Sequence, residues 1–210
     1  MKVHLYLAAL TCAFHFGFAQ EKSTAVVFLE NGDQKKIAEA SGKWNQVGEF
    51  LEAEGAGSKL IAGQQIGAGD FLVRAELALE NMAKSAAVFK MGGSFFGFAG
   101  GHGKIFLTGA FFDDAKGTPI GEPTDFMTDG TPFVLEVNRT GADLKISIDG
   151  KLVHERKVHE KAIGEIGFMP GRAKMRVKNF QATGNLADHF EIELDPPYRV
   201  KEVKGVTKNR

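Results

Sequence analysis

Carboxylate side chains gather in one segment of the sequence, between Asp113 and Thr131. They lie among glycines, prolines and threonines, and they are Asp113, Asp114, Glu122, Asp125 and Asp129. Carboxylate oxygens bind Ca²⁺, but the spacing here does not match the twelve-residue calcium loop. Because the segment has neither the helical nor the strand period, we predict a long solvated loop without a bound metal. No cofactor of any kind is expected.

A glycine-rich segment further upstream carries His102. A histidine can act as a general base, but the sequence identifies no partner for this one. Glycoside hydrolysis needs two carboxylates across the scissile bond. The nearest candidates are the pairs Glu52/Glu54, beside a glycine turn, and Glu191/Glu193, in the C-terminal segment. We therefore expect the chain on its own to be non-catalytic.

Several side chains are of the kinds that recognise sugars. Apolar rings pack against the C–H face of a sugar, and a few planar polar groups bond to its hydroxyls. The candidates are Trp44, Phe96 and Phe98 as platforms, with His102, Arg139, Arg172 and Asn179 as polar partners. An arginine also suits a sugar carboxylate, because its guanidinium bonds to it through two parallel hydrogen bonds.

Each of these candidates has a structural alternative. A phenylalanine in a strand is more often a core residue, and the excess of phenylalanine, 18 residues against 2 tyrosines and 1 tryptophan, is interpreted as packing. A surface arginine is more often only solvated. Trp44 is either a core plug near the sheet edge or an exposed platform for a sugar ring.

The elements that must position these residues are strands. The clearest lies in the segment GDFLVRAELALE (69–80), where Arg74, Glu76 and Glu80 alternate with apolar residues. The apolar set is Phe71, Val73, Ala75, Leu77 and Leu79. Alternation with a period of two predicts a strand with one buried and one solvated face. A second strand is predicted at 86–91, followed by two aromatic-bearing runs on either side of the glycines around His102.

Turn residues mark the hairpins. Asn31-Gly32-Asp33 closes a first strand, and Asp149-Gly150 predicts a type I′ turn, since both of its central positions need a positive φ. The flanking runs bury Phe133, Leu135, Val137, Leu144, Ile146 and Ile148. Between Met175 and Ala182 the apolar phase slips near Lys178-Asn179, which predicts a β-bulge. The segment 35–43 is expected to form one helical turn.

Many short strands with turns between them and no helix of consequence predict an all-β fold. The interpretation is a two-sheet antiparallel β-sandwich of the jelly-roll kind. A closed barrel is the alternative, but the varied strand and loop lengths suit a small barrel less well.

The first nineteen residues are predicted to be a signal peptide, with one lysine, an apolar stretch and cleavage before Gln20. Cys12 lies inside this stretch, so the mature chain contains no cysteine and no disulfide. We expect one domain over 20–187, a linker or tail over 188–210, and a secreted or periplasmic location without a membrane span. The net charge of zero and the lack of a basic stripe argue against nucleic acid as a partner.

The run from Trp44 to Leu186 resembles a known family. The matching segments are GAGSKL (55–60), GDFLVRAELALE, GGSFFGF (92–98), the hairpin PFVLEVNRTG…IDGKLV and the closing GFMPGR…VKNFQATGNL, about two-thirds of the chain. They resemble the laminin-G-like, concanavalin A-like domain that precedes the catalytic propeller in exo-α-sialidases of planctomycetes and related bacteria. The catalytic residues of that family lie in the propeller, whose Ser-x-Asp-x-Gly-x-Thr-Trp turns are absent here.

The resemblance implies a secreted, lectin-like carbohydrate-binding module that directs a sialidase propeller domain to glycans, including sialylated ones. Two other functions are compatible with such a sandwich. One is a glycoside hydrolase similar to the 3-keto-disaccharide hydrolases, and the other is a laminin-G-like protein-interaction domain. A sticky interaction face would cause self-association that sugars do not reverse.

Overall fold

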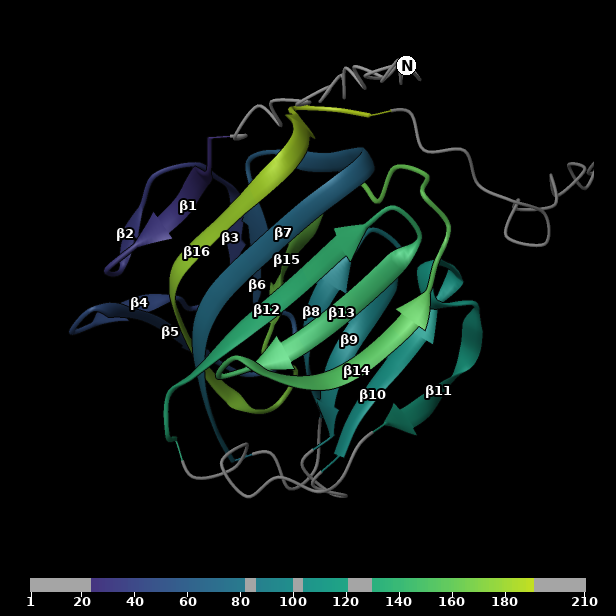
Figure 1. Ribbon diagram of the computed structural model, residues 1–210. Coiled ribbons are helices and arrows are strands. Elements are labelled where there is room, and N and C mark those ends of the chain that lie inside the picture. Colours follow the sequence, from purple (N-terminus) through teal and green to yellow (C-terminus); the bar gives the residue numbers. More distant parts are fainter. Residues whose placement is uncertain (1–23, 82–85, 100–103, 121–129, 191–210) are drawn as a thin grey trace, which may run out of the picture.

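The computed structural model of the protein describes residues 24–81, 86–99, 104–120 and 130–190. These residues form two antiparallel sheets that pack face to face (Figure 1). The interpretation as a two-sheet β-sandwich is confirmed, because the strand order of each sheet ends in strands that do not pair with one another, unlike those of a closed barrel. In the described part of the chain, no helix has the length and apolarity needed to cross a membrane.

The larger sheet has nine strands, and the two central ones, β7 and β16, are also the longest. In spatial order its strands are β14 (Lys151–Lys157), β13 (Asp143–Ile148), β12 (Phe133–Thr140), β7 (Gln65–Glu80), β16 (Lys174–Ala187), β1 (Val26–Glu30) and β2 (Asp33–Gln34). Two further strands complete it: β5 (Phe50–Glu54) pairs with the first residues of β16, and β4 (Asn45–Val47) pairs with β5. This sheet faces the viewer in Figure 1.

The second sheet has seven strands and lies behind the first in Figure 1. In spatial order it consists of β11 (Asp114–Ile120), β10 (Lys104–Gly109), β9 (Ser94–Ala99), β8 (Ala86–Met91), β15 (Ile166–Met169), β6 (Lys59–Ala62) and β3 (Ile37–Ser41). A short 3₁₀ helix, η1 (Ala110–Phe112), connects β10 to β11.

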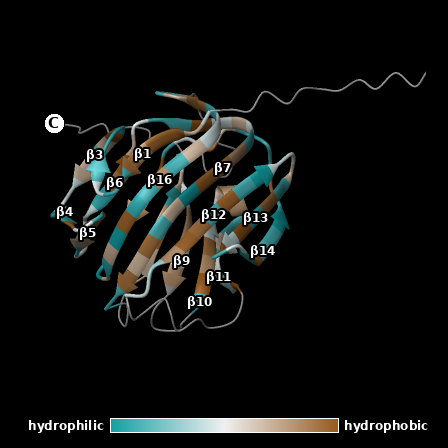
Figure 2. Ribbon diagram, turned by 60° about the vertical axis from the view of Figure 1, so that its left-hand side comes forward, coloured by the Kyte–Doolittle hydropathy of each residue, from teal (hydrophilic) through white to brown (hydrophobic). Residues whose placement is uncertain are grey.

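The core fills the space between the sheets with the inward side chains of both. The predicted inner face of β7 is confirmed, since its five alternating apolar residues are all at most 3 % exposed. Figure 2 shows the resulting alternation of hydrophobic and hydrophilic residues along β7 and β16. Phenylalanine rings from both sheets meet at the centre, where Phe168 contacts Phe89 and Phe180 at centroid distances of 5.2 and 5.0 Å. The excess of phenylalanine therefore serves packing.

The predicted turns and the predicted bulge are present. Asp149 and Gly150 have φ values of 49° and 75° and join β13 to β14, and Asn31 and Gly32 have φ values of 47° and 83°. In β16 the register against β7 shifts between Lys178 and Gln181.

Two expectations about local structure are wrong. The segment expected to form a helical turn contains β3, which pairs with β6 at the sheet edge. The first part of the segment expected to be a loop is strand β11, which follows η1 directly and pairs with β10. In both cases pairing with a neighbouring strand, which is a non-local contact, overrides weak local signals. Glu122, Asp125 and Asp129 lie outside the described residues.

The predicted signal segment and residues 191–210 of the predicted tail lie outside the described residues. The first residues of that tail contact the start of β7: the Phe190 N–H donates to Gln65 Oε1 at 3.0 Å.

Candidate functional site

The structure places two of the three predicted sugar platforms inside the core. Phe96 and Phe98 are both fully buried, and their rings pack edge to face at 5.2 Å, with Phe98 also against Phe133 at 5.5 Å. Neither ring has a face open to a ligand, so the prediction that they are sugar platforms is wrong. The outward phase of β9 is the opposite one, which carries Phe95 and Gly97.

Trp44 is partly buried and packs against the core at the edge of the sandwich. Its indole Nε1 donates a hydrogen bond to the Lys59 carbonyl at 2.9 Å. Of the two roles proposed for this residue, the structure matches the core plug.

Arg139 is fully buried in β12. Its guanidinium lies over the ring of Phe71, 4.9 Å from the centroid, and donates to main-chain carbonyls. Those carbonyls belong to Gly67, Gly69, His159 and Lys161. Burial lowers the pKa of the guanidinium, and the charges of Glu160 and Asp70 oppose that effect. Arg139 therefore connects the start of β7 to the segment between β14 and β15, and the predicted role in binding a ligand carboxylate is wrong.

The structure describes two of the three remaining candidates, Arg172 and Asn179. Arg172 is exposed in the turn between β15 and β16, and His102 lies outside the described residues. Asn179 is exposed on β16 and is the one predicted residue that lines a groove on the surface of the nine-stranded sheet.

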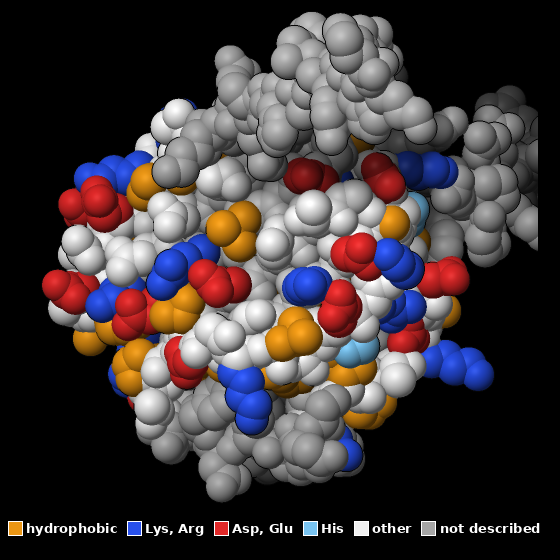
Figure 3. Space-filling model, viewed as in Figure 1, with side chains coloured by type: hydrophobic (Ala, Val, Ile, Leu, Met, Phe, Trp, Pro, Cys, Tyr) orange, Lys and Arg blue, Asp and Glu red, His pale blue; other side chains and the backbone are white. Residues whose placement is uncertain are grey.

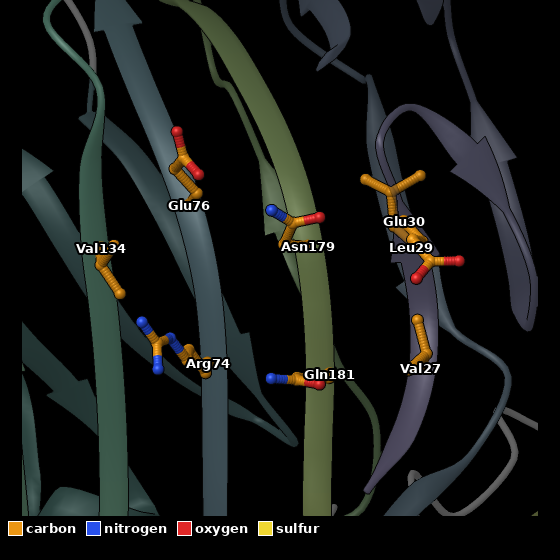
Figure 4. A pocket seen from close by; sticks show the side chains of 8 residues that line it. All are labelled: Val27, Leu29, Glu30, Arg74, Glu76, Val134, Asn179 and Gln181. Atoms are coloured by element: carbon orange, nitrogen blue, oxygen red, sulfur yellow. The ribbon is translucent and has the colours of Figure 1, made fainter. Parts of the chain in front are cut away.

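This groove, called here the sheet groove, has a volume of about 260 Å³ and crosses four neighbouring strands: β12, β7, β16 and β1. It is lined by Val27, Leu29, Glu30, Arg74, Glu76, Val134, Asn179 and Gln181. Figure 4 shows that Gln181 points toward β7 and that Arg74 points toward Val134.

Cross-strand pairing sets most of these side chains in two adjacent rows. One row runs from Glu136 through Arg74 and Gln181 to Val27, each paired with the next across β12, β7, β16 and β1. The next row contains Val134 and Glu76, which pair with one another. Polar groups thus stand beside apolar ones at the spacing of neighbouring strands.

Asn179 enters the groove because of the β16 bulge. Lys178 pairs with Glu76 and Gln181 with Arg74, so two residues of β16 stand opposite one of β7. The extra residue is accommodated by the left-handed conformation of Asn179, with φ at 53°, and asparagine tolerates this region better than most residues do. Phe180 turns into the core while Asn179 faces solvent, where its Oδ1 accepts from the Asn31 N–H at 3.4 Å.

Ion pairs hold the charged side chains of the groove and its rim. Arg74 lies 3.6 Å from Glu136, and Glu76 lies 3.4 Å from Lys178. A hydrogen bond from Lys178 to Glu49, together with the charge of Glu76, raises the pKa of that lysine. Figure 3 shows acidic and basic side chains intermixed over the part of this face that the structure describes.

This arrangement suits recognition of a polar, uncharged or weakly charged ligand. Guanidinium, carboxylate and amide groups provide donors and acceptors, and Val27 and Val134 provide apolar contact. The carboxylates Glu30 and Glu76 each already have a lysine within 4 Å, which suits hydrogen bonding more than proton transfer. Among the described residues no group of three or more His, Cys, Asp or Glu side chains is placed to hold a metal ion.

The sequence indicated part of this site without identifying it. The alternation in 69–80 placed Arg74 and Glu76 on the solvated face, and the phase slip marked the position of Asn179. What the sequence did not show is that β16 lies beside β7, with Gln181 opposite Arg74, since 107 residues separate the two partners along the chain.

Known proteins are similar to this chain in their fold. No protein-family model and no curated protein matches the sequence. Among solved structures, the chain is similar to a Trypanosoma rangeli sialidase in complex with sialic acid (TM-score 0.56, 10% identity, 76% of this chain and 30% of the sialidase). It is also similar to the carbohydrate-binding module CBM66 from Bacillus subtilis (TM-score 0.51, 15% identity, 74% of this chain and 97% of the module).

A third similar structure is described as a sialidase (TM-score 0.52, 15% identity), of which the chain covers 16%. The chain thus spans less than a third of the length of the sialidases it matches. These similarities define the class of the fold: the protein is a two-sheet β-sandwich of the kind found in these structures.

Proposed function

We propose that the protein is a carbohydrate-binding module that holds a glycan in the sheet groove. The observation that carries this proposal is the groove itself, where Arg74, Glu76, Asn179 and Gln181 surround apolar contacts on an ordered sheet. The fold supports the proposal, because a module described as carbohydrate-binding shares it over 97% of its own length.

The finer part of the proposal is a role beside a sialidase. The resemblance noted in the sequence and the similarity to sialidase structures both favour an accessory domain that brings a catalytic domain to its glycan. On this view the protein itself binds and does not cleave, and the sialidase propeller is its partner. A secreted or periplasmic location belongs to the same proposal.

The first test is binding of the purified protein to a glycan array, followed by titration of the best glycan. Asn179→Gly is the decisive variant, because glycine adopts a φ of 53° without strain and so removes the amide alone. We expect about tenfold weaker binding with an unfolding free energy that changes by less than about 0.5 kcal/mol. Lys145→Gln, on the exposed face of β13 outside the groove, is the matched control and should bind like the wild type.

Other outcomes would contradict the proposal. Unchanged glycan binding by Asn179→Gly would remove the sheet groove as the binding site. Hydrolysis of a glycan by the pure protein would replace the module with an enzyme. Self-association that no sugar reverses, without glycan binding, would favour the protein-interaction alternative.

A further inference from the structure

A second cavity opens at one edge of the sandwich, between the two sheets. There β14 ends the nine-stranded sheet and β11 ends the seven-stranded sheet, and both lie at the same side of the molecule (Figure 1). The cavity, called here the edge cleft, has a volume of about 560 Å³. A volume of that size is in the range of small-molecule sites.

Strand pairing shows which side chains face into the edge cleft from β14. His154 pairs with Ile146 and Arg156 with Leu144, and both partners are fully buried. Directly paired residues of an antiparallel sheet share a face, so His154 and Arg156 lie on the inner side of the edge strand. A register shift between Ile146 and Ser147 sets this phase.

The opposite wall comes from β10 and β11. Thr118 pairs with Leu107 and Ile120 with Ile105, two buried residues, so Thr118 and Ile120 also face inward. Ile120 and Leu107 both line the edge cleft and give it an apolar wall. Apolar core residues are thus accessible from the edge cleft, between the polar side chains of β14 and those of β11.

The cations and anions of the edge cleft are not paired with one another. Asp114 is compensated within its own strand, because its carboxylate accepts the N–H groups of Lys116, Gly117 and Thr118 at 3.0, 3.0 and 3.1 Å. Across the cleft Arg156 is half-buried, and its guanidinium forms no ion pair or hydrogen bond with the described residues. A guanidinium in such a position can bind a carboxylate from a ligand.

His154 lies next to that guanidinium on the same strand. Its Nε2 is buried and has no hydrogen-bond partner among the described residues. Burial lowers the pKa of His154, and the charge of Arg156 lowers it further. The other charged groups around the cleft are Asp113, Asp114 and Lys116 from η1 and β11.

We propose that the edge cleft binds a small hydroxylated carboxylate, of the size of one acidic sugar. The carboxylate would bond to Arg156, the apolar face of the ring would lie on Ile120 and Leu107, and the hydroxyls would donate to Asp113 and bond to Thr118. This second site does not rest on the sheet groove, because the two cavities share no lining residue.

The test uses the purified protein and two sugars. Glucuronate is the probe, and glucose, with a hydroxymethyl group in place of the carboxylate, is its matched neutral control. We expect glucuronate to bind about tenfold more tightly than glucose, and Arg156→Gln to weaken glucuronate binding about tenfold. Lys151→Gln, an exposed change on the same strand outside the cleft, should alter binding by less than about twofold.

A second measurement needs no variant at Arg156. The pKa of the His154 imidazole, followed by NMR and assigned with His154→Gln, should rise when glucuronate is added and stay constant with glucose, because a nearby anion favours the imidazolium. Equal binding of both sugars, wild-type affinity in Arg156→Gln, no detectable glucuronate binding, or an unchanged His154 pKa would each overturn the edge-cleft site. Asn179→Gly should leave glucuronate binding intact, which separates this test from that of the sheet groove.

Discussion

Arg139 is the largest fully buried polar side chain among the described residues. Its guanidinium donates to carbonyls of two separate segments: Gly67 and Gly69 at the start of β7, and His159 and Lys161 between β14 and β15. Main-chain carbonyls carry partial negative charge, so several of them together can replace the water that a buried guanidinium loses. The residue is therefore a structural link and no longer a candidate for ligand binding.

Replacing Arg139 should reveal this structural role. Arg139→Met keeps the side chain's approximate length but leaves the four carbonyls without their donor, and we expect a loss of about 3 kcal/mol in unfolding free energy. Urea denaturation measures it, with Lys145→Met on the exposed face of the neighbouring β13 as the control, expected within about 0.5 kcal/mol. Equal stability of the two variants would show that the carbonyl contacts contribute little.

At the scale of the element, β9 shows that a shift of one residue along a strand decides which side chains face the core and which face outward. Its sequence SFFGFA places aromatic rings at both phases, so the sequence alone does not say which ring points inward. Pairing with β8 and β10 decides it, since Phe96 stands opposite the buried Phe89 and Leu107. Phe95 then takes the outer face opposite Lys90 and Thr108.

The two neighbouring phenylalanines allow a matched comparison. Phe96→Ala removes a fully buried ring and should cost about 3–5 kcal/mol in unfolding free energy. Phe95→Ala removes a half-buried ring from the outer face and should cost about 1 kcal/mol. Chemical denaturation of both variants measures the difference, and a reversed order would mean that β9 has the opposite phase.

How far the sequence predicted each element depended on how local its signal was. The part of β7 within 69–80, the Asp149-Gly150 turn and the bulge at Asn179 were predictable, because alternation and turn residues are contained in short segments. Strands β3 and β11 were not, because each is held by pairing to one neighbour and is too exposed to show a clean apolar phase.

The candidate site was less predictable than the strands, because its residues are brought together by non-local pairing. Asn179 was identified as a candidate, but its neighbours in the sheet groove come from strands distant in sequence. The burial of Arg139 was not predictable, because its position before a glycine turn gives no sign that carbonyls of β7 and of the segment after β14 surround its guanidinium. A binding groove on a sheet is a property of register between strands, and register is set by the whole core.

At the scale of the whole molecule, charge is distributed as paired cations and anions over the outer face of the nine-stranded sheet. Near the end of β7, Arg176 and Lys174 of β16 form ion pairs with Glu52 of β5 and Glu80 of β7. Three strands from distant parts of the sequence are thereby connected on the side opposite the core. The zero net charge of the chain is thus the sum of many local pairs, and this face offers no large field of one sign.

This network predicts a dependence of stability on pH. Partial burial alone would raise the pKa of Glu52, but hydrogen bonds from Arg176 and Lys174 lower it below the ordinary value of 4.5. A carboxyl whose pKa is lower in the folded state stabilises the fold above its unfolded pKa, and this stabilisation is lost as the pH falls through the folded pKa.

Glu52→Gln should therefore be less stable than the wild type near neutral pH, by less than about 1 kcal/mol because the pair is partly solvated. The difference should shrink as the pH falls from neutral into the acidic range and through the lowered pKa of Glu52, because the wild-type carboxyl then becomes protonated. Glu54→Gln, two residues along the same strand and exposed, is the control and should show no such trend. Urea unfolding of the three proteins across this pH range measures the effect, and a constant difference would mean that the Glu52 ion pairs do not contribute to stability.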